Sequence, residues 1–292
     1  MAAVKNWTGV SFEEARITLR QWREEHVRRS QEVVEMWEFV LSRHPHSLGD
    51  ELWVVYEQVC IAALDCMRTD LTMACICALE EKFPRSNRVR KLQAMRLEAV
   101  QKFDEALHMY DQLIEYDPTN MSYRKRKAAI LKAKGERLEA IKELNEYLKT
   151  FLNDNETWLE LSSLYLNEGD YARAAHCMEE LILSSPHNSL YLRRLGEIRY
   201  AQGGQENVEI AKAYFEHAVR TNSSCVRSLY GLILACNWLA QKASGQKKKE
   251  YVQCGSAAAE KLLQRYSEIA SDELNSNINA QIKVIKAMKE QF

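Results

Sequence analysis

The sequence predicts an all-α fold, a right-handed solenoid of stacked helix–turn–helix repeats. Ten glycines and four prolines make up only about 5% of the 292 residues, against a usual share of roughly 12%. So few turn-forming residues favour helices joined by short loops. Pro84, Pro118 and Pro186 are separated by 34 and 68 residues, which indicates a 34-residue repeat.

Other positions fall into the same register. In four units beginning at 53, 87, 121 and 155, the second helix carries a small residue and then two large apolar residues, four and seven positions further on. Such a pattern lets two helices cross closely and fills the space between neighbours. The small residues are Thr72, Ala106, Ala140 and Ala174, and the large ones are Ile76, Tyr110, Leu144, Met178, Leu79, Leu113, Tyr147 and Leu181. The period is that of the tetratricopeptide repeat.

The same reading divides the chain into three parts. Residues 1–50 form an N-terminal helical hairpin, with a capping box at Ser11 and helices expected over 12–28 and 30–43. Residues 51–224 hold the repeats, with units near 53, 87, 121, 155 and 189 and about three extra residues around 202–207. Residues 225–292 form a degenerate repeat and a capping helix. The degenerate helices are expected near 225–241 and 250–269, with a basic loop at 242–249, and Leu274, Ile278, Ile282, Ile285 and Met288 form the apolar stripe of the last helix.

Several function classes are disfavoured. The net charge of −1 gives no general attraction to nucleic acid, and no apolar stretch is long enough to span a bilayer. The first residues do not resemble a secretory signal, so we expect a cytosolic chain with reduced cysteines. Cys75 and Cys77 are the closest cysteine pair, but residues two apart on a helix point in nearly opposite directions. We therefore expect no metal, no cofactor and no catalytic residue, and a protein that is not an enzyme.

Basic residues gather at the repeat positions that line the inner groove of a tetratricopeptide solenoid. They predict a groove that binds an acidic peptide, and the alternative is a solvated helix face. The candidate residues are Arg88, Lys91, Lys125, Arg126, Lys132, Arg193 and Arg194. The chaperone-tail clamps of this repeat family hold a terminal carboxylate with asparagines at the sixth and ninth positions of first helices. No asparagine stands at those positions here, which disfavours a chaperone clamp.

Beyond the repeat, particular motifs resemble a known family over residues 12–220. They include Trp22-Arg23-Glu24-Glu25, Asp117-Pro118-Thr119-Asn120, Arg124-Lys125-Arg126-Lys127, Pro186-His187-Asn188 and Gln202-Gly203-Gly204-Gln205. Together they resemble the family of subunit two of the endoplasmic reticulum membrane protein complex, also called tetratricopeptide repeat protein 35.

That resemblance implies a non-catalytic scaffold on the cytosolic side of an insertase for tail-anchored and multi-spanning proteins. It also implies a hetero-oligomer that contacts subunit three, the tail of subunit five, and subunit eight or nine, and that reaches the membrane only through these partners. The alternative that the residues leave open is a free cytosolic adaptor that binds an acidic peptide in its groove.

Charge reversal at Lys125 and Arg126 tests the predicted groove. If the groove binds an acidic segment, the double reversal weakens partner binding and flattens its dependence on salt, because screened charge pairs are lost. The binding is measured by pull-down at two salt concentrations. Unchanged binding with an unchanged salt dependence would assign these residues to a solvated face.

Overall fold

The computed structural model describes residues 9–272 and 276–290, and it does not describe the side chains of residues 269–279. Every regular element in these ranges is helical, which confirms the all-α prediction. The α-helices are α1 (Phe12–Glu24), α2 (Ser30–Phe39), α3 (Glu51–Asp65), α4 (Thr69–Lys82), α5 (Asn87–Ala99), α6 (Phe103–Tyr116), α7 (Met121–Lys134), α8 (Arg137–Thr150), α9 (Asn155–Asn167), α10 (Tyr171–Ser184), α11 (Ser189–Gln202), α12 (Gln205–Thr221), α13 (Val226–Lys242), α14 (Gly245–Asp272) and α15 (Ser276–Glu290).

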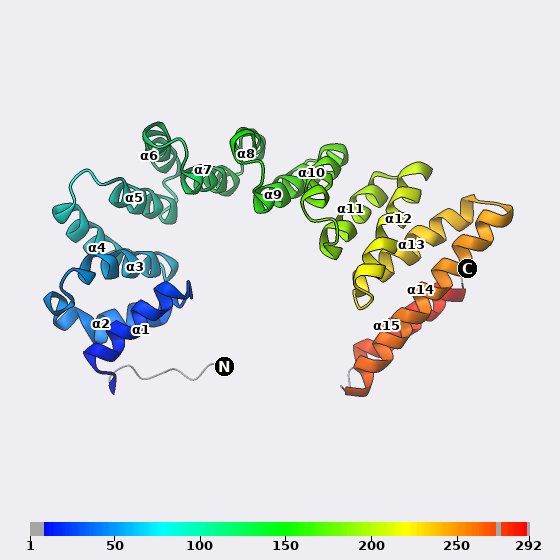
Figure 1. Ribbon diagram of the computed structural model, residues 1–292, viewed down its shortest axis with the longest axis horizontal. Helices are drawn as coiled ribbons and strands as arrows, with labels where there is room; N and C mark the ends of the chain where they lie inside the picture. The colour runs from blue at the N-terminus through cyan, green and yellow to red at the C-terminus, as the bar shows by residue number, and fades with distance from the viewer. Residues whose placement is uncertain (1–8, 273–275, 291–292) are drawn as a thin grey trace. The chain divides into compact units, whose positions relative to one another are not determined.

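The chain forms two compact units, residues 1–143 and 144–292, and the division falls inside α8. Within each unit, successive helices lie beside one another, as the stacked pairs in Figure 1 show. In the first unit α3 packs on α4 and α5 on α6. In the second, α9 packs on α10, α11 on α12 and α13 on α14. The repeat boundaries at residues 50 and 224 stay predictions.

The predicted register matches the packing. Thr72, Ala106, Ala140 and Ala174 are all completely buried. The large residues that follow them are buried as well, each with at most 4% of its surface exposed. A small side chain thus stands wherever two helices cross closely, and a large one fills the next layer.

The N-terminal hairpin begins as predicted and ends earlier. Ser11 and Glu14 form the capping box, each side chain bonded to the other residue's backbone N–H. Helix α1 stops at Glu24 rather than residue 28, because His26 takes a left-handed backbone (φ 54°) and the N–H of Val27 turns back to Trp22 O. Helix α2 ends at Phe39 rather than 43, and the chain continues as two short 3₁₀ helices, Leu41–Arg43 and Pro45–Leu48.

Two expectations about the second unit were wrong in detail. The extra residues expected near 202–207 lie in a helix and not in the turn. Helix α12 has 17 residues where α10 has 14, and only Gly203 and Gly204 separate α11 from α12. The basic stretch 242–249 is not a long loop. Helix α14 begins at Gly245, so Lys247, Lys248 and Lys249 belong to its first turns. Lysine is a good helix former, and this propensity prevails over the repulsion between neighbouring charges.

The last helix packs on α14. Ile285 is completely buried, Met288 is partly buried against the same core, and Lys289 donates to Glu260 Oε1 at 2.7 Å. Leu274 and Ile278 of the predicted stripe lie outside the residues whose side chains are described. The described part of the stripe, at Ile285 and Met288, therefore packs against the core that α14 shares.

Three helices of the second unit meet at one aromatic ring. Phe215 of α12 is 1% exposed. A Cβ added to Gly231 of α13 would lie 2.5 Å from this ring, and a Cβ added to Gly196 of α11 would lie 2.9 Å from it. Both distances are shorter than any ordinary contact, so the two glycines permit the close approach of α11 and α13 to the ring.

Replacing Gly231 by alanine should lower the free energy of unfolding of the second unit by about 1 to 2 kcal/mol. Overpacking in a filled core costs about 1–3 kcal/mol, and the better helix propensity of alanine returns part of that. The effect is measured by urea denaturation. In the double variant Gly231→Ala/Phe215→Leu the two losses should be less than additive, since the smaller side chain makes room for the Cβ. Strict additivity would contradict the proposed contact.

Candidate functional site

The first unit contains a groove of about 470 Å³, here called the N-terminal groove. Its walls come from α1, the α1–α2 turn, α2, α3, α5 and α7. Some of the repeat positions expected to face inward line it, but Arg88, Lys125 and Lys132 do not. The residues that line it are Glu57, Gln58 and Ile61 of α3, Lys91, Leu92 and Met95 of α5, and Ser122 and Arg126 of α7.

The N-terminal hairpin supplies the other side of this groove, which sequence reasoning did not foresee. Arg23, Arg28 and Arg29 line it together with Trp22 and His26. The guanidinium of Arg29 lies 5.4 Å from the centre of the Trp22 ring, a distance typical of a cation–π contact. With Lys91 and Arg126, five basic residues line the groove, against the lining carboxylates of Glu57 and Asp65. Glu51, Glu32 and Glu98 pair with Arg23, Arg29 and Arg126 from outside the lining. The lining itself carries a local positive excess that the net charge of the chain conceals.

Polar residues of α3 hold the hairpin in place. Glu51, Gln58 and Asp65 are seven residues apart, so they form one stripe along the helix. Glu51 accepts hydrogen bonds from Arg16 and Arg20 of α1. The other contacts of this stripe are Arg23 Nη1 to Gln58 Oε1 at 2.7 Å, Gln58 Nε2 to Leu19 O at 3.2 Å, Arg28 Nε to Asp65 Oδ2 at 2.8 Å and Ser30 Oγ to Asp65 Oδ2.

Lys91 is the unbalanced charge of the groove. Its side chain is partly buried, and within the described residues it makes no ion pair. Burial, together with the nearby charges of Arg126 and Arg88, lowers the pKa of Lys91, while Glu57 opposes that shift. An ammonium group that is partly desolvated and surrounded by other cations is stabilised by any anion that enters the groove.

The seven basic candidates do not form one continuous stripe. In the first unit Arg88, Lys91 and Arg126 come together. Arg88 forms an ion pair with Glu57, and Arg126 donates to Glu98 Oε2 at 2.9 Å. Lys125 and Lys132 also lie on α7 but do not line the N-terminal groove.

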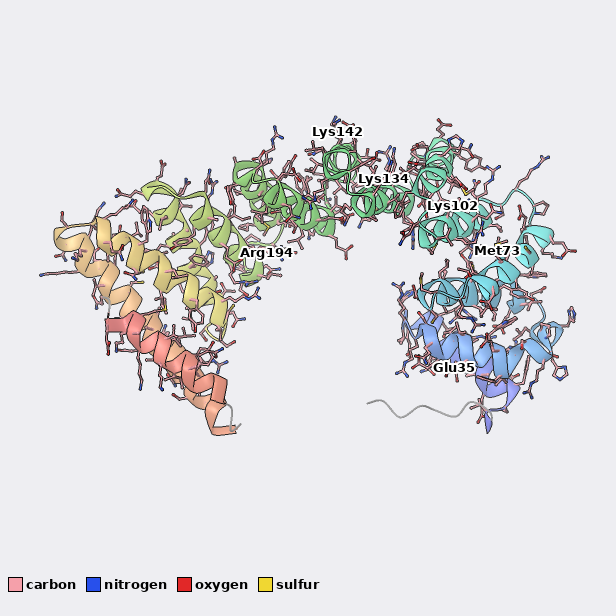
Figure 2. The ribbon with its side chains drawn as sticks, turned by 180° about the vertical axis from the view of Figure 1, so that it is seen from behind. Glu35, Met73, Lys102, Lys134, Lys142 and Arg194 are labelled. Carbon is pink, nitrogen blue, oxygen red and sulfur yellow. The ribbon has the colours of Figure 1, made fainter. Side chains whose placement is uncertain are left out.

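In the second unit Arg193 and Arg194 lie on α11 and differ in exposure. The Arg193 side chain is only 8% exposed and pairs with Glu197 at 3.1 Å. Arg194 lines a separate groove of about 410 Å³ with Glu197 and Arg227, and Figure 2 labels its side chain on α11. Arg193 is therefore a structural residue of this unit, and only Arg194 faces a groove.

The described residues contain neither a cluster of metal ligands nor a membrane-spanning helix. Nowhere in residues 9–272 and 276–290 do three or more His, Cys, Asp or Glu side chains gather as metal ligands would. Among the same residues, no helix combines the length and the apolar character that crossing a membrane requires. Cys75 is buried and Cys77 is exposed, as their spacing of two on a helix predicts.

Comparison with known proteins gives the family. The family model described as the EMC2 TPR-like repeat domain matches residues 74–216. ER membrane protein complex subunit 2-A of Xenopus laevis is 45% identical over 268 residues, which cover 91% of this chain and 90% of that protein. The chain belongs to the family of ER membrane protein complex subunit 2. The resemblance found in the sequence motifs is thereby confirmed.

More distant members of the subunit 2 family share most of the chain. The Dictyostelium discoideum subunit 2 is 30% identical over 258 residues, covering 84% of this chain and 79% of that one. Among solved structures, the C-terminal part of a TPR repeat-containing protein from Cytophaga hutchinsonii superposes with a TM-score of 0.62. It covers 92% of this chain and 98% of that chain at 15% identity. This likeness confirms the stacked helical repeats of the fold.

The contact between Arg28 and Asp65 predicts a dependence of stability on pH. Hydrogen bonds from Arg28 hold the pKa of Asp65 below its ordinary value of 3.8. A carboxylate whose pKa is lower in the folded state stabilises the fold above its unfolded pKa, and this contribution is lost as the pH falls through the folded pKa. Asp65→Asn should therefore lower the free energy of unfolding near neutral pH, and the deficit relative to the wild type should shrink steadily below about pH 4.

Urea denaturation of both proteins between pH 7 and the lowest pH at which they stay folded measures this difference. Asp50→Asn is the matched control, because Asp50 stands at the start of the same helix and its side chain caps nothing. A deficit of Asp65→Asn that stays constant with pH would show that the carboxylate charge is not what holds the hairpin.

Proposed function

We propose that this chain is a non-catalytic scaffold subunit of an endoplasmic reticulum membrane protein complex, on its cytosolic face. The observation that carries the proposal is the 45% identity to ER membrane protein complex subunit 2-A over nine tenths of both chains. At this identity and coverage, the surfaces that serve assembly are expected to be shared along with the fold.

In this proposal the chain contributes to an insertase for tail-anchored and multi-spanning membrane proteins. It contacts cytosolic segments of subunit three, subunit five, and subunit eight or nine, and it reaches the membrane only through them. Helical repeats suit such a role, because they present extended concave surfaces for other chains rather than closed, water-excluding pockets.

The N-terminal groove supports a role in holding a partner segment. Its cations attract an extended peptide that carries acidic side chains, and the exposed Val27 and half-buried Ile61 give such a peptide apolar surface to cover. The same groove also favours the second candidate function, a free cytosolic adaptor for acidic peptides. The two candidates differ in whether the chain resides in a stoichiometric membrane assembly.

Native purification of the tagged chain from gently solubilised membranes, followed by mass spectrometry, tests the proposal. The expected result is a stoichiometric set of endoplasmic reticulum membrane proteins, with the chain in the membrane fraction until detergent releases it. Recovery of the chain alone from the soluble fraction, or with acidic peptide-bearing partners only, would contradict the scaffold and favour the adaptor.

A pair of variants tests the groove in the same assay. Lys91→Gln/Arg126→Gln should lower the recovery of at least one partner about fivefold or more, because the charge contacts that hold it are lost. Lys142→Gln is the control, because its side chain is 69% exposed and projects from α8 (Figure 2). Equal recovery of every partner with both variants would show that the groove does not bind a partner in the assembly.

A further inference from the structure

Two thiols of the second unit lie against one another. Cys236 of α13 is completely buried, and Cys254 of α14 is half-buried. Both side chains belong to the core that α12, α13 and α14 share, and each thiol is the largest influence on the pKa of the other. Both thiols are free, so the pair is in its reduced form.

The outer thiol of the pair is polarised by charged neighbours. Cys254 Sγ lies 3.2 Å from Glu216 Oε1, and Lys212 Nζ lies 2.6 Å from the same oxygen. The hydrogen bond from Cys236 lowers the pKa of Cys254, burial and Glu216 oppose the shift, and Lys212 adds to it. The pKa of Cys236 is raised, mainly by that same hydrogen bond and by burial. The two thiols therefore differ, and Cys254 is the one that ionises first.

A pocket of about 190 Å³ opens onto Cys254. Val219, Leu229 and Leu232 form its apolar walls, and Ala257 and Ala258 leave room beside the sulfur. The exposed side chains of Arg220 and Lys261 also line it. The pocket thus offers a thiol on an apolar floor with two cations at its margin, and its one lining carboxylate, Glu216, is paired with Lys212. This lining suits a small disulfide that carries carboxylates.

We propose that Cys254 and Cys236 form a dithiol modification site that takes glutathione disulfide as its oxidant. Cys254 is the attacking thiol, Cys236 is the resolving thiol beneath it, and Arg220 and Lys261 attract the carboxylates of the incoming tripeptide. The product is a disulfide that links α13 to α14.

The chemistry is two thiol–disulfide exchanges. The Cys254 thiolate attacks one sulfur of glutathione disulfide, forms a mixed disulfide and releases one glutathione thiolate, which takes up the proton that Cys254 lost. Cys236 then gives up its proton and attacks the Cys254 sulfur, which breaks the mixed bond and releases the second glutathione as a thiolate, which takes up that proton. Two cysteine thiols are oxidised, and one glutathione disulfide is reduced to two glutathiones. In a reducing cytosol the site stays a dithiol, and it closes when glutathione disulfide rises.

The test exposes the reduced full-length chain to glutathione disulfide at neutral pH and maps the cysteines by non-reducing peptide mass spectrometry. The wild type should yield the linked Cys236–Cys254 peptides, and dithiothreitol should remove the link. The variant Cys236→Ser should accumulate a stable glutathione adduct on Cys254, since nothing resolves it. The variant Cys254→Ser should leave Cys236 unmodified, because that sulfur is buried.

Cys225 serves as the internal comparison. Burial raises the pKa of Cys225, but hydrogen bonds involving Ser228 outweigh that effect and lower it. No thiol is among the groups that shift its pKa, so Cys225 should stop at the glutathione adduct even in the wild type. Thermal melts of each variant establish that it is folded before its cysteines are mapped.

A separate rate measurement tests the role of Arg220 and Lys261. Arg220→Gln/Lys261→Gln should slow the reaction of Cys254 with glutathione disulfide about threefold or more, and should leave its reaction with neutral hydroxyethyl disulfide unchanged. The proposal is overturned if the wild type forms no Cys236–Cys254 link while Cys225 and the exposed Cys77 are modified, or if Cys254 in Cys236→Ser reacts no faster than Cys77. Equal slowing with both disulfides would show that Arg220 and Lys261 do not attract the carboxylates of glutathione disulfide.

Discussion

The N-terminal groove depends on the polar stripe of α3. Glu51, Gln58 and Asp65 bind arginines of the hairpin at three successive levels of the helix, and Asp65 also accepts a bond from Ser30. Bidentate contacts between a guanidinium and a carboxylate fix orientation as well as distance. Ala15 and Leu19 of α1 are completely buried in the same contact. The hairpin is therefore oriented by charge pairs and stabilised by apolar burial, and its remaining arginine surface is left facing the groove.

This arrangement explains how a chain with a net charge of −1 acquires a cationic groove. Most arginines at the groove are neutralised by a carboxylate on a neighbouring helix, as Arg28 is by Asp65 and Arg126 by Glu98. Lys91 has no such partner and is partly buried, so the positive excess of the groove is concentrated around it. An anionic segment of a partner would supply the missing charge, which is why the groove suits the proposed scaffold role.

The sequence predicted the helix pairs well and the groove only in part. Ala106, Ala140 and Ala174 lie where helices cross, and this steric requirement recurs every 34 residues, so periodicity reveals it. The contacts of the hairpin do not recur. Arg28 and Asp65 are 37 residues apart, and a single long-range pair leaves no periodic trace. The seven-residue spacing of Glu51, Gln58 and Asp65 on the largely apolar α3 was the available signal. The buried position of Arg193 was hidden for a similar reason, because its exposure depends on neighbouring helices.

Hydrogen–deuterium exchange of the variant Glu51→Gln/Asp65→Asn tests the central claim most directly, namely that the polar stripe of α3 holds the hairpin and so forms the groove. The account predicts faster exchange of the backbone amides of α1 and α2 than in the wild type, with unchanged exchange in α9 to α13, which belong to the other unit. Unchanged exchange in α1 and α2 would contradict it, and would mean that apolar burial alone holds the hairpin against α3.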